Sequence, residues 1–429
     1  MMAETKGELM VRLRISTTDI PQVERPPVNL VLAIDTSGSM KGEAIDSARA
    51  AAAGVVGALA DGDRLAVVSF HSKGDVVFPS TAITAATRDS MLDAIRRIEA
   101  RGTTNLAAGM SLAIAEVSRH RTADGVNRAI LLSDGIPNNP ASIPQMIAQA
   151  KASAIPVTAL GFGLDYDESL LTRVATGTGG RFLFVEEPES VVGAFLDEVL
   201  RLEKIVARNM GLLLTPGPGL QIVEVFGSEL GFAGRTGSVA LGDHSLGEVR
   251  DVIVKMSGRA RRDGSNVEVL DAVLSFDNAV GATARFERTA FVSVESTSDV
   301  ARHSAARNRD VELSAARADA AATTIKAIAM ARSGQLDPAR ALLKLAEKRA
   351  RKAAKDFGGD AELAALADSM IELNKALPTF VGQVLEQPGL DPSGRPRPRA
   401  LPEPGSEDPA APQTVRRSHS EATKTLQGR

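Results

Sequence analysis

The stretch Asp35-Thr36-Ser37-Gly38-Ser39 decides the fold, because it stands between a strand pattern and a helix pattern. The preceding run, 28–34, is apolar and rich in branched side chains, which predicts a strand buried on both faces. The following stretch, 42–60, carries apolar residues at helical spacing. One carboxylate and two hydroxyls therefore leave the C-terminal end of a strand together. Oxygen ligands of this kind suit a hard cation such as Mg²⁺.

The five residues alone also allow a purely structural interpretation, in which Ser37 or Ser39 caps the helix. Two later segments favour a site. Residues 101–106, RGTTNL, open another helical stretch, and 129–135, AILLSDG, form another buried strand that ends in a carboxylate. Ligands collect at the C-terminal ends of strands in open α/β sheets. We therefore expect all three segments to present oxygen ligands at one edge of one sheet.

These segments resemble the von Willebrand factor A family and its metal-ion-dependent adhesion site. The family pattern is Asp-x-Ser-x-Ser, then a Thr, then an Asp, on three separate loops. The five positions are filled here by Asp35, Ser37, Ser39, Thr104 and Asp134. The resemblance covers residues 27–204 and implies a doubly wound, Rossmann-like α/β domain.

One position in the pattern is ambiguous. The family often has Gly-Gly-Thr-Asn before the third helix, where this chain has Gly102-Thr103-Thr104-Asn105. Alignment on Asn105 makes Thr104 the ligand and puts Thr103 in the place of the second glycine. Thr103 therefore remains the alternative ligand at this position.

The resemblance implies a site for Mg²⁺, with Mn²⁺ or Ca²⁺ as other candidate ions, completed by a Glu or Asp of a protein partner. We therefore predict a metal-dependent, bacterial-type protein-binding and scaffold module. One alternative is an adaptor for a MoxR-like AAA+ ATPase. Another is a component of a Ser/Thr kinase signalling system, supported only by Arg416-Arg417-Ser418-His419-Ser420 in the predicted tail.

Enzymatic activity is not expected, because the sequence contains none of the familiar phosphate-binding, nucleophile-elbow or zinc-protease motifs. The chain has no Cys, which excludes thiolate zinc sites and cysteine nucleophiles. His71, beside Ser72 at a strand end, is the one histidine that is a candidate for the rim of the site. A solvated loop position is the alternative interpretation of His71.

Composition predicts an ordinary globular, cytoplasmic protein without nucleic-acid or membrane partners. The chain has 429 residues, a formal net charge of −3, 44% hydrophobic residues and 3% aromatic residues. This charge gives no basic footprint for nucleic acid, and so few aromatic residues argue against base stacking. No signal peptide and no segment of membrane-spanning length are evident.

The order of patterns along the chain predicts five regions. Strands and helices alternate in the α/β domain, short β runs at regular spacing follow it, and an Ala-rich helical region precedes a Pro-rich end. The predicted regions are 1–26, a strand that joins a β-sandwich; 27–204, the α/β domain; 205–298, the β-sandwich; 299–378, a helical hairpin or bundle; and 379–429, a disordered tail.

Overall fold

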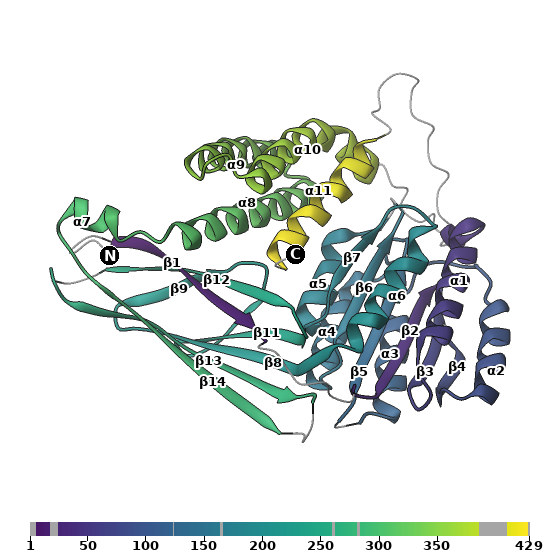
Figure 1. Cartoon of the computed structure of the whole chain (residues 1–429). Helices are drawn as coiled ribbons and strands as arrows, with labels where there is room; N and C mark the ends of the chain where they lie inside the picture. The colour runs from purple at the N-terminus through teal and green to yellow at the C-terminus, as the bar shows by residue number, and fades with distance from the viewer. Residues whose placement is uncertain are drawn as a thin grey trace. The chain divides into compact units, whose positions relative to one another are not determined.

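The structure is a computed structural model of the whole chain (Figure 1). The chain divides into two compact units. The structure describes residues 6–17, 25–122, 124–163, 166–259, 262–280, 284–385 and 410–427. The first unit comprises Met1–Leu9, Arg14–Arg250 and Lys255–His303, and the second comprises Met10–Leu13, Asp251–Val254 and Ser304–Arg429. Every helix within the described residues is too short or too polar to cross a membrane.

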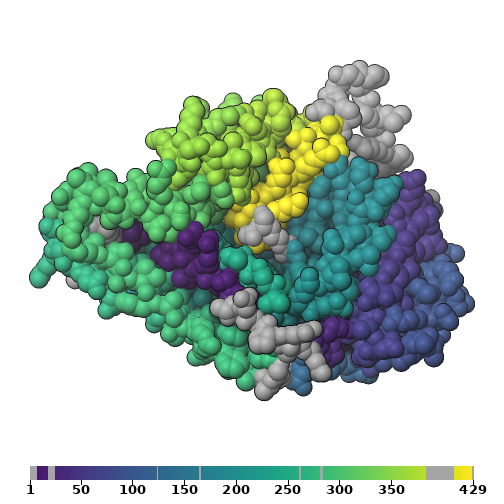
Figure 2. All heavy atoms as spheres, viewed as in Figure 1, coloured from purple at the N-terminus to yellow at the C-terminus, as the bar shows by residue number. Residues whose placement is uncertain are grey.

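An α/β domain with one six-stranded sheet forms much of the first unit, drawn from purple to teal in Figures 1 and 2. The sheet order is β4-β3-β2-β5-β6-β7, and all pairs are parallel except the antiparallel β3–β4 pair. Its strands are β2 (Val28–Asp35), β3 (Arg64–Phe70), β4 (Gly74–Ala82), β5 (Val126–Ser133), β6 (Val157–Phe162) and β7 (Phe182–Val185). This is the doubly wound arrangement that the alternating pattern predicts.

Helices cover both faces of this sheet. Its helices are α1 (Glu43–Ala58), α2 (Ala85–Arg96), α3 (Leu106–Arg119), α4 (Ile143–Ala152), α5 (Glu168–Thr178) and α6 (Ser190–Leu202), with short 3-10 turns η1 (Gly38–Met40) and η2 (Pro140–Ser142). Residues Leu30 and Leu32 of β2 pack with α1, α2 and α6, whereas Val31 and Ala33 pack with α3, α4 and α5. Successive strand residues point to opposite faces, so a strand covered on both sides is apolar throughout.

Two further sheets contain the β-rich region that follows the α/β domain. One has the order β1-β12-β9 and the other β10-β11-β8-β13-β14. Their strands are β1 (Lys6–Ser16), β8 (Ile205–Pro216), β9 (Leu220–Val225), β10 (Leu230–Ala233), β11 (Thr236–Ser245), β12 (Val249–Arg259), β13 (Asn266–Asn278) and β14 (Arg285–Glu295). Strand β1 thus joins strands that lie more than two hundred residues later in the chain.

The C-terminal region is helical and extends further than the sequence predicts. It contains α7 (Val300–Ala305), α8 (Arg309–Arg332), α9 (Leu336–Asp356), α10 (Ala361–Leu385) and α11 (Ala411–Leu426). Helices α8 to α11 share an apolar core that includes Ile328, Leu343, Leu373 and Val415. Helix α10 continues through Pro378 because Phe380 and Val381, beyond the proline, are buried in this core.

The prediction of a disordered tail over 379–429 is wrong for the end of α10 and for α11. Helix α11 buries Ala411, Val415 and Ala422, whose helical spacing is hidden in an otherwise polar sequence. Residues 386–409, also predicted to be disordered, lie outside the described residues.

The support that residues 416–420 give to the kinase alternative requires an accessible tail, and the described helix does not provide one. Ser418 and Ser420 are both buried, and Ser369 Oγ of α10 donates a hydrogen bond of 2.8 Å to Ser418 Oγ. A phosphate on either side chain would have to displace α11 from its neighbours.

Candidate metal centre

Asp35 is the buried anchor of the site at the end of β2. Its carboxylate is fully buried and accepts hydrogen bonds from two donors. The backbone N–H of Ser37 donates to Oδ1 at 2.8 Å, and Ser133 Oγ donates to Oδ2 at 2.8 Å. Because Ile34 of β2 lies opposite Leu132 of β5, the next residues on both strands, Asp35 and Ser133, come side by side.

The two serines of the first loop face the carboxylate of the third. Ser37 Oγ lies 2.9 Å from Ser39 Oγ, and Ser39 Oγ donates to Asp134 Oδ1 at 2.9 Å. Neither serine caps helix α1, whose N-cap residue is Gly42, and the Ser37 side chain makes no capping bond to η1. The capping interpretation of these serines is therefore wrong.

The loop that carries Thr104 is held against the first loop by backbone hydrogen bonds. Arg101 N donates to Thr36 O at 2.6 Å, and Gly38 N donates to Gly102 O at 3.0 Å. Thr104 is buried beside Gly135, where an added Cβ would lie 2.7 Å from Thr104 Oγ1. Thr104 thus lies next to the loop of Asp134.

Thr103 has different neighbours. Its Oγ1 lies 3.2 Å from Ser72 Oγ, and its backbone N–H also donates to Ser72 Oγ at 3.2 Å. Both contacts are exposed and involve the loop after β3. The geometry therefore favours Thr104 over Thr103 as the residue that faces the two aspartates.

The electrostatics of the site depend on Asp35. Burial raises the pKa of its carboxyl from 3.8 to about 6, although the hydrogen bonds from Ser37 and Ser133 act in the opposite direction. Both donors are neutral, so in the described residues no side-chain cation compensates this carboxylate. A bound cation would supply the missing charge.

The donor set has the chemistry of a hard-cation site. It combines two carboxylates with three hydroxyls, all oxygen, on three loops at one sheet edge. No group of three or more His, Asp or Glu side chains within the described ranges could hold a metal ion, so any site here depends on the hydroxyls. Ser133 belongs to the arrangement although the sequence analysis missed it. Its position beside Asp134, at the end of the neighbouring strand, was the available signal.

His71 is not the solvated loop residue of the alternative interpretation. It is 7% exposed, and its Nε2 lies 3.2 Å from Arg101 Nε and 3.3 Å from Asp75 Oδ2. Its backbone O accepts a hydrogen bond of 2.8 Å from the N–H of Asn105, the residue after Thr104. His71 therefore supports the loop that carries Thr104.

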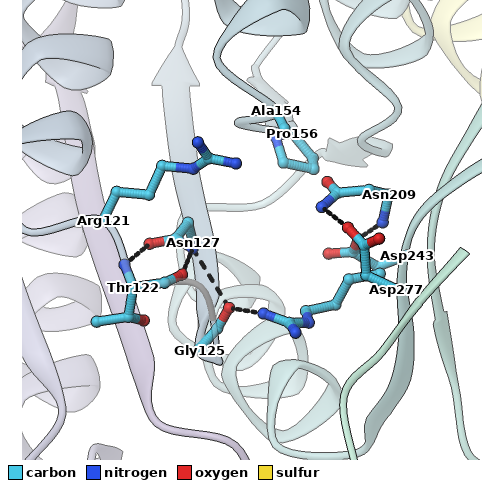
Figure 3. A pocket seen from close by; sticks show the side chains of 10 residues that line it. Arg121, Thr122, Gly125, Asn127, Ala154, Pro156, Asn209, Asp243 and Asp277 are labelled. Carbon is cyan, nitrogen blue, oxygen red and sulfur yellow. Dashed lines mark hydrogen bonds between the residues drawn. The ribbon is translucent and has the colours of Figure 1, made fainter. Parts of the chain in front are cut away.

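The opposite end of the same sheet has another polar cluster, where the α/β domain meets β8, β11 and β13 (Figure 3). A cavity of about 180 Å³ lies there, lined by residues that include Arg121, Asn209 and Asp277. Arg208 donates to Gly125 O, and Asn209 Nδ2 donates to Asp277 Oδ2 at 2.8 Å. These groups bond chiefly to one another, which is typical of a packed polar junction.

Residues 29–198 match the family model described as von Willebrand factor type A domain. The chain contains a von Willebrand factor type A domain. An uncharacterized protein of Synechocystis sp. is 27% identical over 214 residues, which is 49% of this chain and 50% of the relative. The uncharacterized protein YfbK of Escherichia coli is 28% identical over 200 residues, 44% of this chain and 34% of YfbK.

The chain thus spans half or less of the length of these curated relatives. A solved structure titled von Willebrand factor type A from Catenulispora acidiphila has a similar fold over nearly the whole chain. Its TM-score is 0.74 with 18% identity, and the match covers 99% of this chain and 94% of that one. A von Willebrand factor type A domain is generally a protein-interaction or adhesion module.

Proposed function

We propose that the von Willebrand factor type A domain binds Mg²⁺, or Mn²⁺ or Ca²⁺ in its place, at the edge formed by its three loops. The ligand groups are the side chains of Asp35, Ser37, Ser39, Thr104 and Asp134. One observation carries the proposal: Ser37 Oγ contacts Ser39 Oγ, and Ser39 Oγ bonds Asp134, beside a buried Asp35 that has only neutral donors.

The charges of these groups suit a divalent ion that remains reactive. Asp35 and Asp134 together balance two positive charges, whereas the three hydroxyls add oxygen atoms without adding charge. When bound, the ion supplies an electrophilic position for one more oxygen ligand. The hydrogen bonds from Ser37 and Ser133 fix the orientation of the Asp35 carboxylate, which reaches the ion directly or through a water.

The function we infer is metal-dependent capture of a partner protein through a Glu or Asp side chain of that partner. The partly buried setting strengthens the attraction between the ion and the incoming carboxylate. We assign the protein a binding and scaffold role in the cytoplasm, with the partner carboxylate as the group that completes the metal site.

Metal binding is tested by calorimetry with Mg²⁺ on the full chain. We expect binding to the native protein and none to Asp134→Ala. Asp46→Ala is the matched control, because Asp46 is an exposed aspartate on α1. Equal Mg²⁺ affinity in native protein and Asp134→Ala contradicts the ligand assignment, provided that both proteins give the same circular dichroism spectrum.

Partner capture is tested by a pull-down from the native host with and without EDTA. Proteins retained by the native chain with Mg²⁺, but lost with EDTA and with Asp134→Ala, are the expected partners. Their identity distinguishes a scaffold from an ATPase adaptor or a kinase component. A retained set that is indifferent to both EDTA and the substitution contradicts the proposed function.

A further inference from the structure

A cavity of about 280 Å³ opens directly beside the proposed metal site. Thr36, which lies between Asp35 and Ser37 in the chain, is part of its wall, and Arg101, three residues before Thr104, is another part. The backbone bond from Arg101 N to Thr36 O ties these two walls together. The cavity therefore borders two of the loops that carry proposed metal ligands.

The lining combines an apolar part with guanidinium groups. Val77, Ala94 and Ile98 supply apolar surface. Arg97 is exposed at the end of α2 and has no ion pair within the described residues, and the Arg101 side chain is 64% exposed. A guanidinium is matched to a carboxylate, with which it forms paired hydrogen bonds.

The acidic residues of the lining are Asp75 and Glu99. Asp75 already has a cation beside it, because Lys73 Nζ lies 3.2 Å from its Oδ1. The hydrogen bond from Lys73 is the largest cause of a lowered pKa of Asp75. Arg101 Nη2 lies 3.7 Å from Asp75 Oδ2, which is within ion-pair distance but too far for a hydrogen bond. Counting Lys73, three cations face two anions.

His71 orients one of the guanidiniums. Arg101 Nε donates to His71 Nε2 at 3.2 Å, and the imidazole itself is 7% exposed. Its Nδ1 is buried without a hydrogen-bond partner in the part of the chain that the structure describes. A buried polar atom is normally satisfied, so this unsatisfied nitrogen is unusual for a residue whose role is packing alone.

We propose that this cavity binds a second acidic side chain of the same partner, so that the metal site and the cavity bind two carboxylates at the same time. This proposal rests on the proposed function, because the first carboxylate is the one that completes the metal site. Arg97 and Arg101 receive the second carboxylate, and the apolar surface receives its methylene groups. The partner class is therefore an acidic segment with two nearby carboxylates, at least one of them on a glutamate-like stem.

The test uses three small probes with the Mg²⁺-loaded full chain, followed by NMR titration. Glutarate carries two carboxylates, butyrate carries one with a methyl end, and 4-aminobutyrate carries one with an ammonium end. We expect glutarate to bind roughly tenfold more tightly than butyrate, the factor of one added charge-assisted contact. Arg97→Gln should remove this preference and leave Mg²⁺ affinity unchanged.

Two further variants sharpen the test. Glu99→Gln removes an opposing charge and should strengthen glutarate binding, whereas Arg121→Gln, at the opposite end of the sheet, should change nothing. Equal binding of glutarate and butyrate to the native chain overturns the proposal. Tighter binding of 4-aminobutyrate overturns it as well, because it would mean that Glu99 and Asp75 receive a cation.

Failure of the proposed function gives a different result. If butyrate affinity does not respond to Mg²⁺, capture of a carboxylate by the metal is wrong. Under those conditions a preference for glutarate that Arg97→Gln removes still supports the cavity as a carboxylate site. If the native chain shows no preference for glutarate, the cavity proposal is wrong as well.

Discussion

The buried charge near one end of strand β5 has an ion-pair partner, whereas the buried charge at the other end has none among the described residues. Near its start, Arg128 is fully buried and pairs with Asp243 of β11, with Arg128 Nη2 and Asp243 Oδ2 2.7 Å apart. At its end, Ser133 holds the buried Asp35, which no side-chain cation accompanies in the described residues. Asp243 neutralises Arg128 at one end, whereas Asp35 at the other end has only neutral hydrogen-bond donors. A paired buried charge is typical of a structural role, and an unpaired one is typical of a binding site.

The largest change in stability should come from breaking the ion pair between Arg128 and Asp243. Asp243→Asn removes the anion that pairs directly with the buried Arg128, so the free energy of unfolding of this unit should fall by about 3–5 kcal/mol. Asp35→Asn should cost the metal-free protein far less, because its oxygen can still accept from Ser37 N. Urea unfolding of both variants measures the difference.

A double variant separates charge from packing in this comparison. Arg128→Met with Asp243→Leu removes both charges and should recover most of the loss. Equal losses in Asp243→Asn and Asp35→Asn would mean that the two ends of β5 do not differ in the way proposed.

The next effect concerns the two threonines. Thr104→Ala should lower Mg²⁺ affinity roughly tenfold to a hundredfold, whereas Thr103→Ala should lower it little, because Thr103 faces Ser72. Calorimetry on both variants checks the order. The reverse order would move the ligand to Thr103.

The pH dependence follows from the raised pKa of Asp35. Its folded pKa of about 6 exceeds the ordinary 3.8, so the metal-free folded state holds a proton that the unfolded state releases. The contribution of Asp35 to stability without metal is therefore fully present below about pH 4 and is lost as the pH rises through 6.

Metal binding has the opposite dependence, because it needs the carboxylate. Mg²⁺ affinity should be roughly tenfold lower at pH 5 than at pH 8. Thermal unfolding with and without Mg²⁺ across this range measures both effects, and Asp35→Asn is the control. A Mg²⁺-induced rise in Tm that is the same at pH 5 and pH 8 would exclude Asp35 from the site.

The smallest effect should come from Ser133, which contacts Asp35 without being a proposed ligand. Ser133→Ala removes one of the two donors to the carboxylate and should lower Mg²⁺ affinity by up to roughly tenfold. Ser118→Ala on α3 is a control, because that hydroxyl donates to the backbone O of Ile114 in its own helix, away from Asp35. An affinity unchanged in Ser133→Ala would mean that Ser37 N alone positions Asp35.

Much of the α/β domain was predictable because its signals are local. The apolar run before Asp35 and the helical spacing after it correctly predict β2 and α1, and the same is true of the strand that ends at Ser133. The end of the chain was not predictable in this way. Helix α11 depends on apolar residues that are few and distant in a polar sequence, and their burial depends on α8 and α10.

The sequence by itself determined the residue types of the candidate site and their attachment to the ends of strands. Loop residues and strand patterns depend on residues that are adjacent in the sequence, so they can be predicted without knowing which segments pack together. Only the tertiary structure decided that Thr104 rather than Thr103 lies against Gly135 in the loop of Asp134, that Ser133 bonds Asp35, and that Arg128 pairs with Asp243. These relations join residues up to 115 positions apart. No local pattern fixes them, because they arise from the packing of separate strands.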